Sequence, residues 1–370
     1  MAPNDEHRRK RVKVDQKKNK KTKNDAKEPQ TAGIDIPALS EASPAKGTFL
    51  ITAGTYERIL YGIEAQFVGT LLTLSPRFIF PAHIGCIKAV SAGGRFLASG
   101  STDEIVKLYD LKKRVELGSL HEHKGSITSL QFHGHTHLLT ASDDGAICIF
   151  RSKDWEPLKV LKAHRAAVTD IAIHPSGKLA LSVSLDRSMI LWNLLTGQKA
   201  SRTRTPQAGE LVEWSKSGAM YAIAYATEIQ IYRVGEPDAV AMVSSRQRIT
   251  SILFTEFGGN DFLLVGSQDK HVHIYSTAGD ELAAAQLHDN RIKGLSAVDV
   301  TFPDESVHTV VASVSSDGYI KAWKLDDLVG ELDPKSKPDP KKVPELAVEP
   351  LAKYNADVRL TCVAASNDIY

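Results

Sequence analysis

Cysteine is scarce in this sequence of 370 residues, which has only Cys86, Cys148 and Cys362. The count is odd and the three positions lie far apart. The pattern therefore argues against the disulfide framework of a small secreted domain and shows no metal-ligand spacing. We expect a protein of a reducing compartment, with no metal site built from cysteine.

Long hydrophobic runs are also missing. No apolar stretch approaches the roughly 20 residues that cross a bilayer, and no apolar run follows the basic N-terminus as it would in a secretory signal. The phosphate-binding pattern GxxxxGK(S/T) and the metal-binding patterns HExxH and CxxC do not occur. We expect a soluble intracellular protein with no membrane partner, and we predict neither an enzyme nor a cofactor.

Positive charge is concentrated at one end of the chain. The whole sequence has 46 Lys and Arg against 44 Asp and Glu, whereas residues 1–28 have 11 against 5. Such a segment cannot bury a core, so residues 1–46 are predicted to be a disordered tail. A basic tract of this kind favours a nuclear localisation signal or contact with nucleic acid, and a merely solubilising extension is the alternative. The tail cations are Arg8, Arg9, Lys10, Arg11, Lys13, Lys17, Lys18, Lys20, Lys21 and Lys23.

One short pattern, an aliphatic residue, often Thr, any residue and another apolar residue, recurs along the remainder. It begins at Ile87, Ile127, Val168, Leu211, Ile249, Ile292 and Leu360, with successive spacings of 40, 41, 43, 38, 43 and 68. A second pattern follows the first six copies, with a small residue, then usually Asp, then alternating apolar residues ending in an aromatic one. Alternation with period two predicts strands, and the Gly-rich stretches between them predict turns.

Four short strands in a unit of about 40–45 residues are typical of a β-propeller blade. The last unit supplies only an opening strand at 359–366, whereas the first part supplies three strands with no opening strand. Joining the two ends completes a blade and removes the exposed edges. We predict an all-β, seven-bladed propeller over residues 47–370, closed by three N-terminal strands and one C-terminal strand, with six or eight blades as the alternative. A Pro- and Lys-rich insertion at about 330–345 is predicted to be a flexible loop between the last two strands of its blade.

The repeat resembles that of WD-repeat proteins, in which Asp, His, Ser or Thr, and Trp form a buried hydrogen-bond chain. The resemblance implies this structural role for two sets: His164, Asp186 and Trp192 with Ser182 or Ser184, and His288, Ser315, Asp317 and Trp323. A hydrolase triad is the alternative for the first set, but a catalytic site would occur once, whereas these residues recur with the blade. His133, His135 and His137 alternate in one short stretch and are interpreted as a solvated turn, with a metal site as the alternative.

Several segments, among them "AGTYERILYG", "SGSTDEIVKLYDLKKRVELGSL" and "SSDGYIKAWKL", resemble the p21-activated-kinase-interacting family, which includes the fungal maintenance-of-killer proteins. The resemblance implies a nucleolar scaffold in assembly of the large (60S) ribosomal subunit. Its partners would be ribosomal or assembly proteins of the precursor particle, with rRNA as a further partner of the tail and a basic arc. Outside the particle we expect a monomer. The alternative function is a signalling adapter that binds and restrains p21-activated kinase.

Loop positions predict a basic arc on one face of the ring. In a WD-repeat propeller, that face carries the turns between second and third strands and the links between blades. The alternative is that several of these cations pair with loop acids such as Asp289 and Glu210 or are simply solvated. The predicted arc consists of Arg165, Arg187, Arg202, Arg204, Arg246, Arg248, Lys270 and Arg291.

Overall fold

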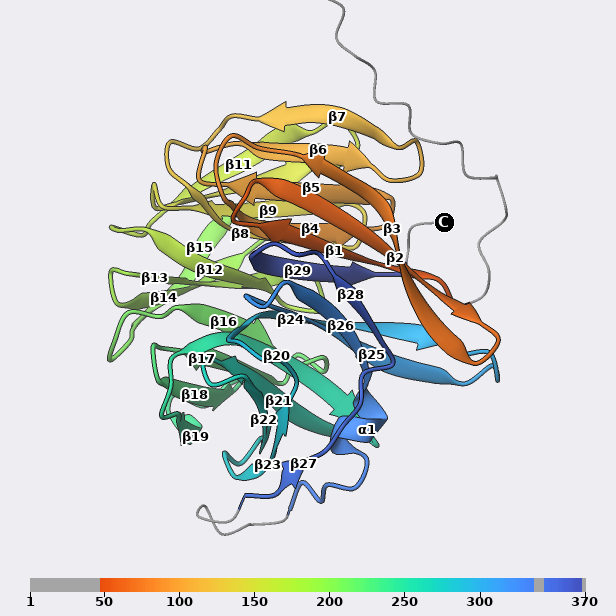
Figure 1. Ribbon diagram of the computed structural model, residues 1–370. Coiled ribbons are helices and arrows are strands. Elements are labelled where there is room, and N and C mark those ends of the chain that lie inside the picture. Colours follow the sequence, from red (N-terminus) through yellow and green to blue (C-terminus); the bar gives the residue numbers. More distant parts are fainter. Residues whose placement is uncertain (1–46, 336–342, 368–370) are drawn as a thin grey trace, which may run out of the picture. The chain divides into compact units, whose positions relative to one another are not determined.

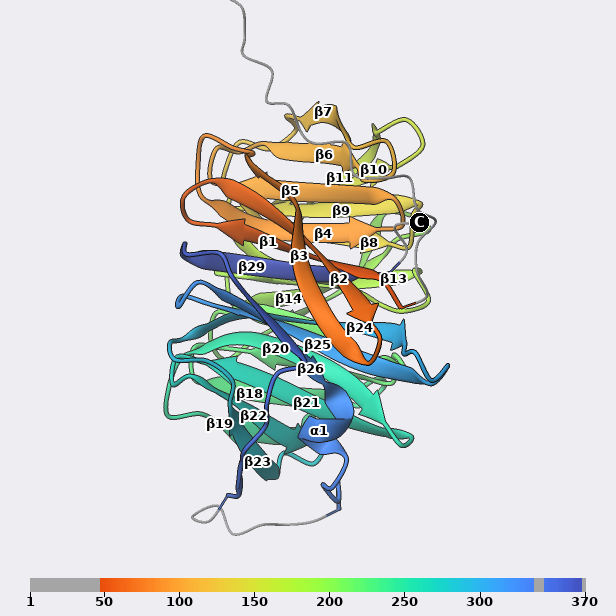
Figure 2. The same cartoon turned by 45° about the vertical axis from the view of Figure 1, so that its right-hand side comes forward.

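The computed structural model describes residues 47–335 and 343–367, all of which fall within one compact unit. They form seven sheets arranged as the blades of a propeller (Figures 1 and 2), antiparallel except for one short parallel pairing in blade 5, which confirms the predicted fold class. The predicted tail at residues 1–46 lies outside the described residues. Within the described ranges, no helix has the length and apolarity that a bilayer crossing requires.

Six blades follow the chain from the first complete unit onward, and the first strand of each is its inner strand. Blade 1 contains β4 (Ile87–Gly93), β5 (Phe96–Ser101), β6 (Val106–Asp110) and β7 (Val115–Leu120). Blade 2 contains β8 (Ile127–His133), β9 (His137–Ser142), β10 (Ala146–Arg151) and β11 (Glu156–Lys162). Blade 3 contains β12 (Val168–Ile173), β13 (Leu179–Ser184), β14 (Ser188–Asn193) and β15 (Gln198–Arg204). Blade 4 contains β16 (Leu211–Trp214), β17 (Met220–Ala224), β18 (Glu228–Arg233) and β19 (Ala239–Ser244). Blade 5 contains β20 (Ile249–Phe257), β21 (Asn260–Ser267), β22 (His271–Ser276) and β23 (Glu281–Gln286). Blade 6 contains β24 (Ile292–Thr301), β25 (Val307–Ser315), β26 (Tyr319–Lys324) and β28 (Ala352–Asn355).

The seventh, composite blade joins the two ends of the described chain. Its strand order is β29 (Leu360–Ser366), β1 (Phe49–Thr55), β2 (Ile59–Val68) and β3 (Leu71–Pro81). In Figure 1 the dark blue β29 lies beside the red-orange β1, and Leu50 pairs with Ser366 at one end of their ladder. The Thr361 hydroxyl also donates to the Ile87 carbonyl at 2.7 Å, which ties this blade to blade 1. The predicted closure by one C-terminal and three N-terminal strands is confirmed.

Apolar side chains from adjacent blades form the core, because each sheet is covered on both faces by its neighbours. One cluster joins β1 and β2 to β24 and β25, and another joins β13 to β17. The middle strands are therefore almost entirely buried, whereas every residue of the outer strand β15 is exposed. The close approach of β1 to the inner strand β4 of blade 1 demands glycine at Gly54, where an added Cβ would lie 2.5 Å from the Ile87 side chain.

The insertion between β26 and β28, the last two strands of blade 6, also contacts blade 5. It starts with the short helix α1 (Leu325–Val329), whose Leu325, Leu328 and Val329 are buried. It later contributes β27 (Glu345–Leu346), which pairs in parallel with β23 as a fifth strand of blade 5. The sequence predicted a flexible loop at 330–345, of which residues 336–342 lie outside the described part. The strand at its end was not predicted, because two residues carry no readable alternation.

Candidate functional site

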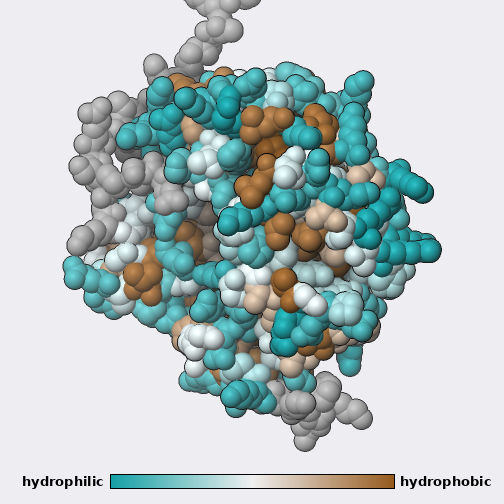
Figure 3. Space-filling model, turned by 180° about the vertical axis from the view of Figure 1, so that it is seen from behind, coloured by the Kyte–Doolittle hydropathy of each residue, from teal (hydrophilic) through white to brown (hydrophobic). Residues whose placement is uncertain are grey.

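The propeller has two faces, defined by their turns. The upper face carries the turns between the second and third strands of each blade and the links between blades. The lower face carries the turns between first and second strands and between third and fourth strands. In the space-filling view of Figure 3, hydrophilic residues cover most of the visible surface and hydrophobic ones form small separate groups. On this side of the molecule, charge and hydrogen bonding are therefore the main guides to function.

His164, for which a hydrolase triad was the alternative, belongs to a buried hydrogen-bond chain in blade 3. His164 Nδ1–H donates to Asp186 Oδ2 at 3.3 Å, and its Nε2 lies 2.7 Å from the Ser182 hydroxyl. The Trp192 indole N–H donates to the same hydroxyl at 2.8 Å. Ser182, fully buried, is the member of the chain, whereas Ser184 bonds backbone groups near the turn. A serine enclosed in this way holds strands together and has no access to a substrate.

Blade 6 repeats this arrangement with one correction to the predicted set. His288 Nδ1–H donates to Asp317 Oδ2 at 3.0 Å, and Ser313, not Ser315, lies between His288 Nε2 and the Trp323 indole, at 2.8 Å from each. Ser315 lies two residues nearer the turn, where its hydroxyl donates to the Asn290 carbonyl. The two serines share one face of the strand because side chains alternate with period two, so the sequence pattern alone did not separate them.

Two further blades contain shortened versions of the chain. His83 joins Asp103 at 3.0 Å to Ser99 at 2.8 Å, and His123 joins Asp144 at 3.1 Å to a threonine hydroxyl at 2.7 Å. Tyr109 and Phe150 take the place of tryptophan. The same geometry in four blades is a property of the repeat, so these histidines are interpreted as structural.

Burial determines the protonation state of this chain. Burial lowers the pKa of His288, although the Asp317 carboxylate opposes the shift. Burial would raise the pKa of Asp317, but hydrogen bonds from His288 and the Tyr319 backbone lower it to about 2. The aspartate is therefore charged at neutral pH and the imidazole is neutral, with its proton on Nδ1. That state orients the ring as a bridge between the turn and the serine.

In blade 5, the histidine that contacts the turn aspartate is charged, whereas the corresponding histidine of blade 6 is neutral. Asp269 occupies the usual turn position, but its partner is His273 on β22, at 2.8 Å, and Glu281 contacts the other ring nitrogen at 2.6 Å. Burial alone would lower the pKa of His273, but hydrogen bonds to the two carboxylates outweigh it and raise the pKa to about 9. The imidazole is therefore charged at neutral pH.

This difference predicts an alkaline loss of stability. A histidine whose folded-state pKa is about 9 stabilises the fold fully below its unfolded value of about 6.5, and that contribution disappears as pH rises through 9. We expect His273→Gln to be less stable than the parent at pH 6, with the difference shrinking towards pH 9.5. Urea unfolding at several pH values measures it. A difference that grows with pH would contradict the assignment.

Two carboxyl groups on neighbouring inner strands were not singled out by sequence reasoning. Asp170 on β12 accepts a hydrogen bond from the Val212 backbone N–H at 3.0 Å, so its side chain links blades 3 and 4. Burial raises the pKa of Asp170 to about 6, and burial together with the Asp170 charge raises the pKa of Glu213 to about 8. The arrangement satisfies backbone donors between blades and keeps the Glu213 carboxyl protonated at neutral pH.

The three alternating histidines lie on one hairpin of the lower face. His133 ends β8 and pairs in register with His137 at the start of β9, while His135 lies in the turn. Within residues 47–335 and 343–367, no group of three or more His, Cys, Asp or Glu side chains is arranged to hold a metal ion. His137 Nδ1–H donates to the Thr136 hydroxyl at 3.0 Å. Two of the histidines, His135 and His137, line a pocket that is described below.

The structure places all eight residues of the predicted basic arc on the upper face. Arg202 pairs with Asp186 and Arg248 with Glu210, each at 2.9 Å, so the alternative of pairing with loop acids holds for two of the eight. Arg291 donates to the Ser316 hydroxyl at 3.1 Å instead of pairing with Asp289. Within the described part of the chain, no ion pair engages the remaining five: Arg165, Arg187, Arg204, Arg246 and Lys270.

Sequence reasoning missed the continuation of this positive region onto the inner strands. Burial lowers the pKa of Lys293 on β24, and the charges of Arg291, Arg359 and Arg248 lower it further. The side chain therefore lies within the field of three other cations from three blades. A signal was available, because Thr usually occupies the second position of the repeated pattern, as in Thr250, whereas blade 6 has Lys293 there.

Comparison with known proteins agrees with this architecture. The family model described as "WD domain, G-beta repeat" matches residues 74–110, 114–151 and 155–193. Each match begins in or just before the outer strand of one blade and ends with the third strand of the next, so the sequence repeat is offset from the blade by one strand. That offset is what a composite closing blade requires.

Named relatives share most of the chain. The p21-activated protein kinase-interacting protein 1-like of Gallus gallus is 36% identical over 315 residues, covering 85% of this chain and 79% of the relative. The p21-activated protein kinase-interacting protein 1 of Homo sapiens is 36% identical over 322 residues, covering 85% and 76%. Protein MAK11 of Saccharomyces cerevisiae is 33% identical over 330 residues, covering 76% and 78%.

Proposed function

Since this chain belongs to the WD-repeat family that includes the p21-activated protein kinase-interacting proteins and MAK11, we propose that it is a non-enzymatic scaffold in assembly of the large (60S) ribosomal subunit. It acts in the nucleolus, on precursors of that subunit, where it docks ribosomal or assembly proteins and contacts rRNA. Outside the particle it is a monomer. The resemblance of the sequence to the family supports this assignment of process and place.

The observation that carries the scaffold role is the unpaired part of the basic arc. Arg165, Arg187, Arg246 and Lys270 lie on turns or links of the upper face of blades 3 to 5, and Arg204 ends β15 at the same face. All five are exposed. Within the described residues, none of them stabilises the fold through an ion pair. Guanidinium and ammonium groups presented in this way suit phosphate groups or the carboxylates of an acidic partner segment.

Residues 1–46 contribute the second element of the proposal. This segment lies outside the described residues, so its role is argued from composition. Its ten clustered lysines and arginines between Arg8 and Lys23 serve as a nuclear address and add electrostatic attraction to rRNA phosphates.

A charge-reversal experiment tests the arc. We expect Arg187→Glu/Arg246→Glu/Lys270→Glu to leave the thermal midpoint within about 2 °C of the parent, because exposed charges contribute little to stability. The variant should nevertheless be released from large-subunit precursors on a sucrose gradient. The matched control is Lys159→Glu/Lys199→Glu/Lys353→Glu, which makes the same charge change on exposed outer strands. Full co-sedimentation of the arc variant would contradict the proposal.

A kinase-binding adapter is the second candidate, because several relatives are named for an interaction with a p21-activated protein kinase. An adapter would capture the kinase in proportion to kinase concentration and without RNA. Purification before and after ribonuclease treatment separates the two roles, since a ribosomal scaffold loses most of its partners when the precursor particle is digested.

A further inference from the structure

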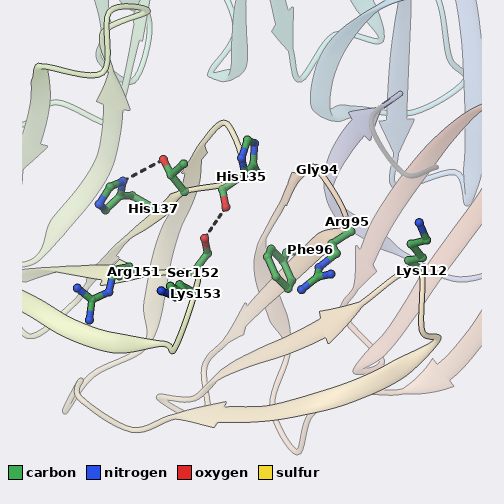
Figure 4. A pocket seen from close by; sticks show the side chains of 10 residues that line it. Gly94, Arg95, Phe96, Lys112, His135, His137, Arg151, Ser152 and Lys153 are labelled. Atoms are coloured by element: carbon green, nitrogen blue, oxygen red, sulfur yellow. Dashed lines mark hydrogen bonds between the residues drawn. The ribbon is translucent and has the colours of Figure 1, made fainter.

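The lower face has a pocket of about 820 Å³ between blades 1 and 2 (Figure 4). Its walls are the β4–β5 and β6–β7 turns of one blade and the β8–β9 and β10–β11 turns of the other. This volume lies within the range of about 300–1,000 Å³ that is usual for ligand sites. Because these turns lie at the opposite ends of the strands from the basic arc, the pocket is a separate site. It is lined by Gly94, Arg95, Phe96, Lys112, His135, Thr136, His137, Arg151, Ser152 and Lys153.

Internal contacts hold the walls of this pocket in place. The Arg95 guanidinium lies over the Phe96 ring, 4.8 Å from its centroid, and its Nε is 3.5 Å from Asp110 Oδ2. On the other wall, the Ser152 hydroxyl donates to the His135 carbonyl, and the Ser152 N–H donates to the Thr136 carbonyl at 3.0 Å. Each wall is therefore a pair of cross-linked turns, and the pocket does not depend on ligand-induced ordering.

The cations of the pocket divide into two kinds. Arg151 is fixed by Asp154 at 2.6 Å and Glu156 at 2.7 Å, and Arg95 is held near Asp110. In the part of the chain that the structure describes, neither Lys112 nor Lys153 has an ion-pair partner, and both are exposed. Two flexible ammonium groups are thus available from opposite blades, in a pocket whose arginines are already oriented.

The same lining offers one exposed flat ring beside the free charges. In Figure 4 the exposed His135 lies on the turn at the edge of the pocket, whereas the ring of half-buried His137 points away from Arg95 and Phe96, towards blade 3. An exposed ring such as that of His135 can stack on a base, while lysines contact the flanking phosphates, which is the usual combination for single-stranded nucleic acid.

We propose that this pocket binds single-stranded RNA, with Lys112 and Lys153 on its phosphates and His135 beside a base. An acidic or phosphorylated peptide fits less well, because no aliphatic side chain lines the pocket to receive a peptide's apolar residues. The neighbouring pocket of about 430 Å³ between blades 2 and 3 provides the contrast, since Leu139, Leu158 and Leu195 line it. That the RNA is ribosomal rests on the proposed function, whereas RNA binding by the pocket does not.

Ultraviolet cross-linking of the full-length protein to a 12-nucleotide RNA of mixed sequence, followed by mass spectrometry, locates the contact. We expect cross-linked peptides from residues 94–96 and 133–153. In Lys112→Glu/Lys153→Glu these cross-links should fall at least fivefold, while any cross-links to the tail remain. The matched control Lys199→Glu/Lys353→Glu, with two exposed lysines on outer strands, should retain them. Equal thermal midpoints of the three proteins establish that the fold is unchanged.

Salt dependence adds an independent measure of the same contacts. Each phosphate contact to a single strand contributes about 0.7 to the slope of log K against log salt, so the pocket variant should lose about 1.4 from the parent slope. Cross-links confined to the tail, or an unchanged slope, would overturn the proposal. Displacement of RNA from the pocket by a lower concentration of a phosphorylated acidic peptide would overturn it as well.

The outcome can be separated from that of the proposed function. The arc variant Arg187→Glu/Arg246→Glu/Lys270→Glu should retain the pocket cross-links, because those residues lie on the upper face. If the parent protein does not sediment with ribosomal precursors but still cross-links through the pocket, the proposed function fails and this inference stands.

Discussion

Deleting residues 359–370 is expected to leave a protein that is largely insoluble or melts at least 15 °C below the parent. The deletion removes β29, which pairs with β1 along six residues, from Leu50 with Ser366 to Thr55 with Leu360. Each ladder hydrogen bond contributes about 1 kcal/mol net, and burial of Leu360 alone contributes about 2 kcal/mol. The sum approaches the whole stability of a typical domain, which is about 5–15 kcal/mol.

The loss also has a structural consequence beyond its free energy. Every residue of β1 is buried, so without β29 a long apolar edge becomes available for pairing with another chain. Soluble yield and differential scanning fluorimetry measure the effect, with deletion of residues 368–370 as the control. Adding a peptide of residues 356–370 should restore part of the midpoint. A truncated protein with the parent's midpoint would show that the ring does not depend on this strand.

Replacing Asp317 with alanine should have the next largest effect, a loss of about 2–4 kcal/mol in the free energy of unfolding. The carboxylate accepts from His288 and from the backbone N–H groups of Asp289 and Tyr319. All three donors would lose their partner, and unsatisfied buried groups cost about 1–3 kcal/mol each, reduced by water entering at the turn. Glu236→Ala, which removes an exposed partner of Arg233, is the control and should cost less than about 1 kcal/mol.

The pH dependence of this effect has a definite sign. Because the folded-state pKa of Asp317 is about 2, below its ordinary value of 3.8, its contribution is complete above about pH 4 and is lost as pH falls towards 2. Parent and variant should therefore converge in acid, as measured by chemical unfolding. Ser313→Ala should shift the NMR resonance of the Trp323 indole N–H, whereas Ser315→Ala should leave it almost unchanged. The reverse pattern would restore the set predicted from sequence.

The fold was predictable because propeller repeats carry their information locally. Period-two alternation, Gly turns and a recurring Asp identified the strands, and an incomplete blade at each end, with one strand at the C-terminal end and three at the N-terminal end, implied closure. Details that depend on neighbouring blades were not predictable. Whether Ser313 or Ser315 joins the hydrogen-bond chain depends on the distance to His288. The strand β27 forms because the edge of β23 is free, and a strand of two residues has no sequence pattern that predicts it.

Surface properties were the least readable part of the sequence. Turn positions identified the face of the basic arc. They did not predict that Arg248 pairs with Glu210, because these two residues lie 38 positions apart on two successive links between blades. The lower pocket is more hidden still, because Lys112, His135 and Lys153 come from three turns whose proximity exists only in the folded ring. In the sequence, the three alternating histidines suggested a metal site. In the fold, lysines and arginines from other turns lie beside them.

Affinity purification of the tagged full-length protein, with identification of both proteins and RNA, tests the central claim most directly. We expect large-subunit precursor rRNA together with ribosomal and assembly proteins, and we expect most of these proteins to disappear after ribonuclease treatment. Recovery of a p21-activated kinase with no precursor rRNA, unchanged by ribonuclease, would contradict the scaffold role and favour the adapter.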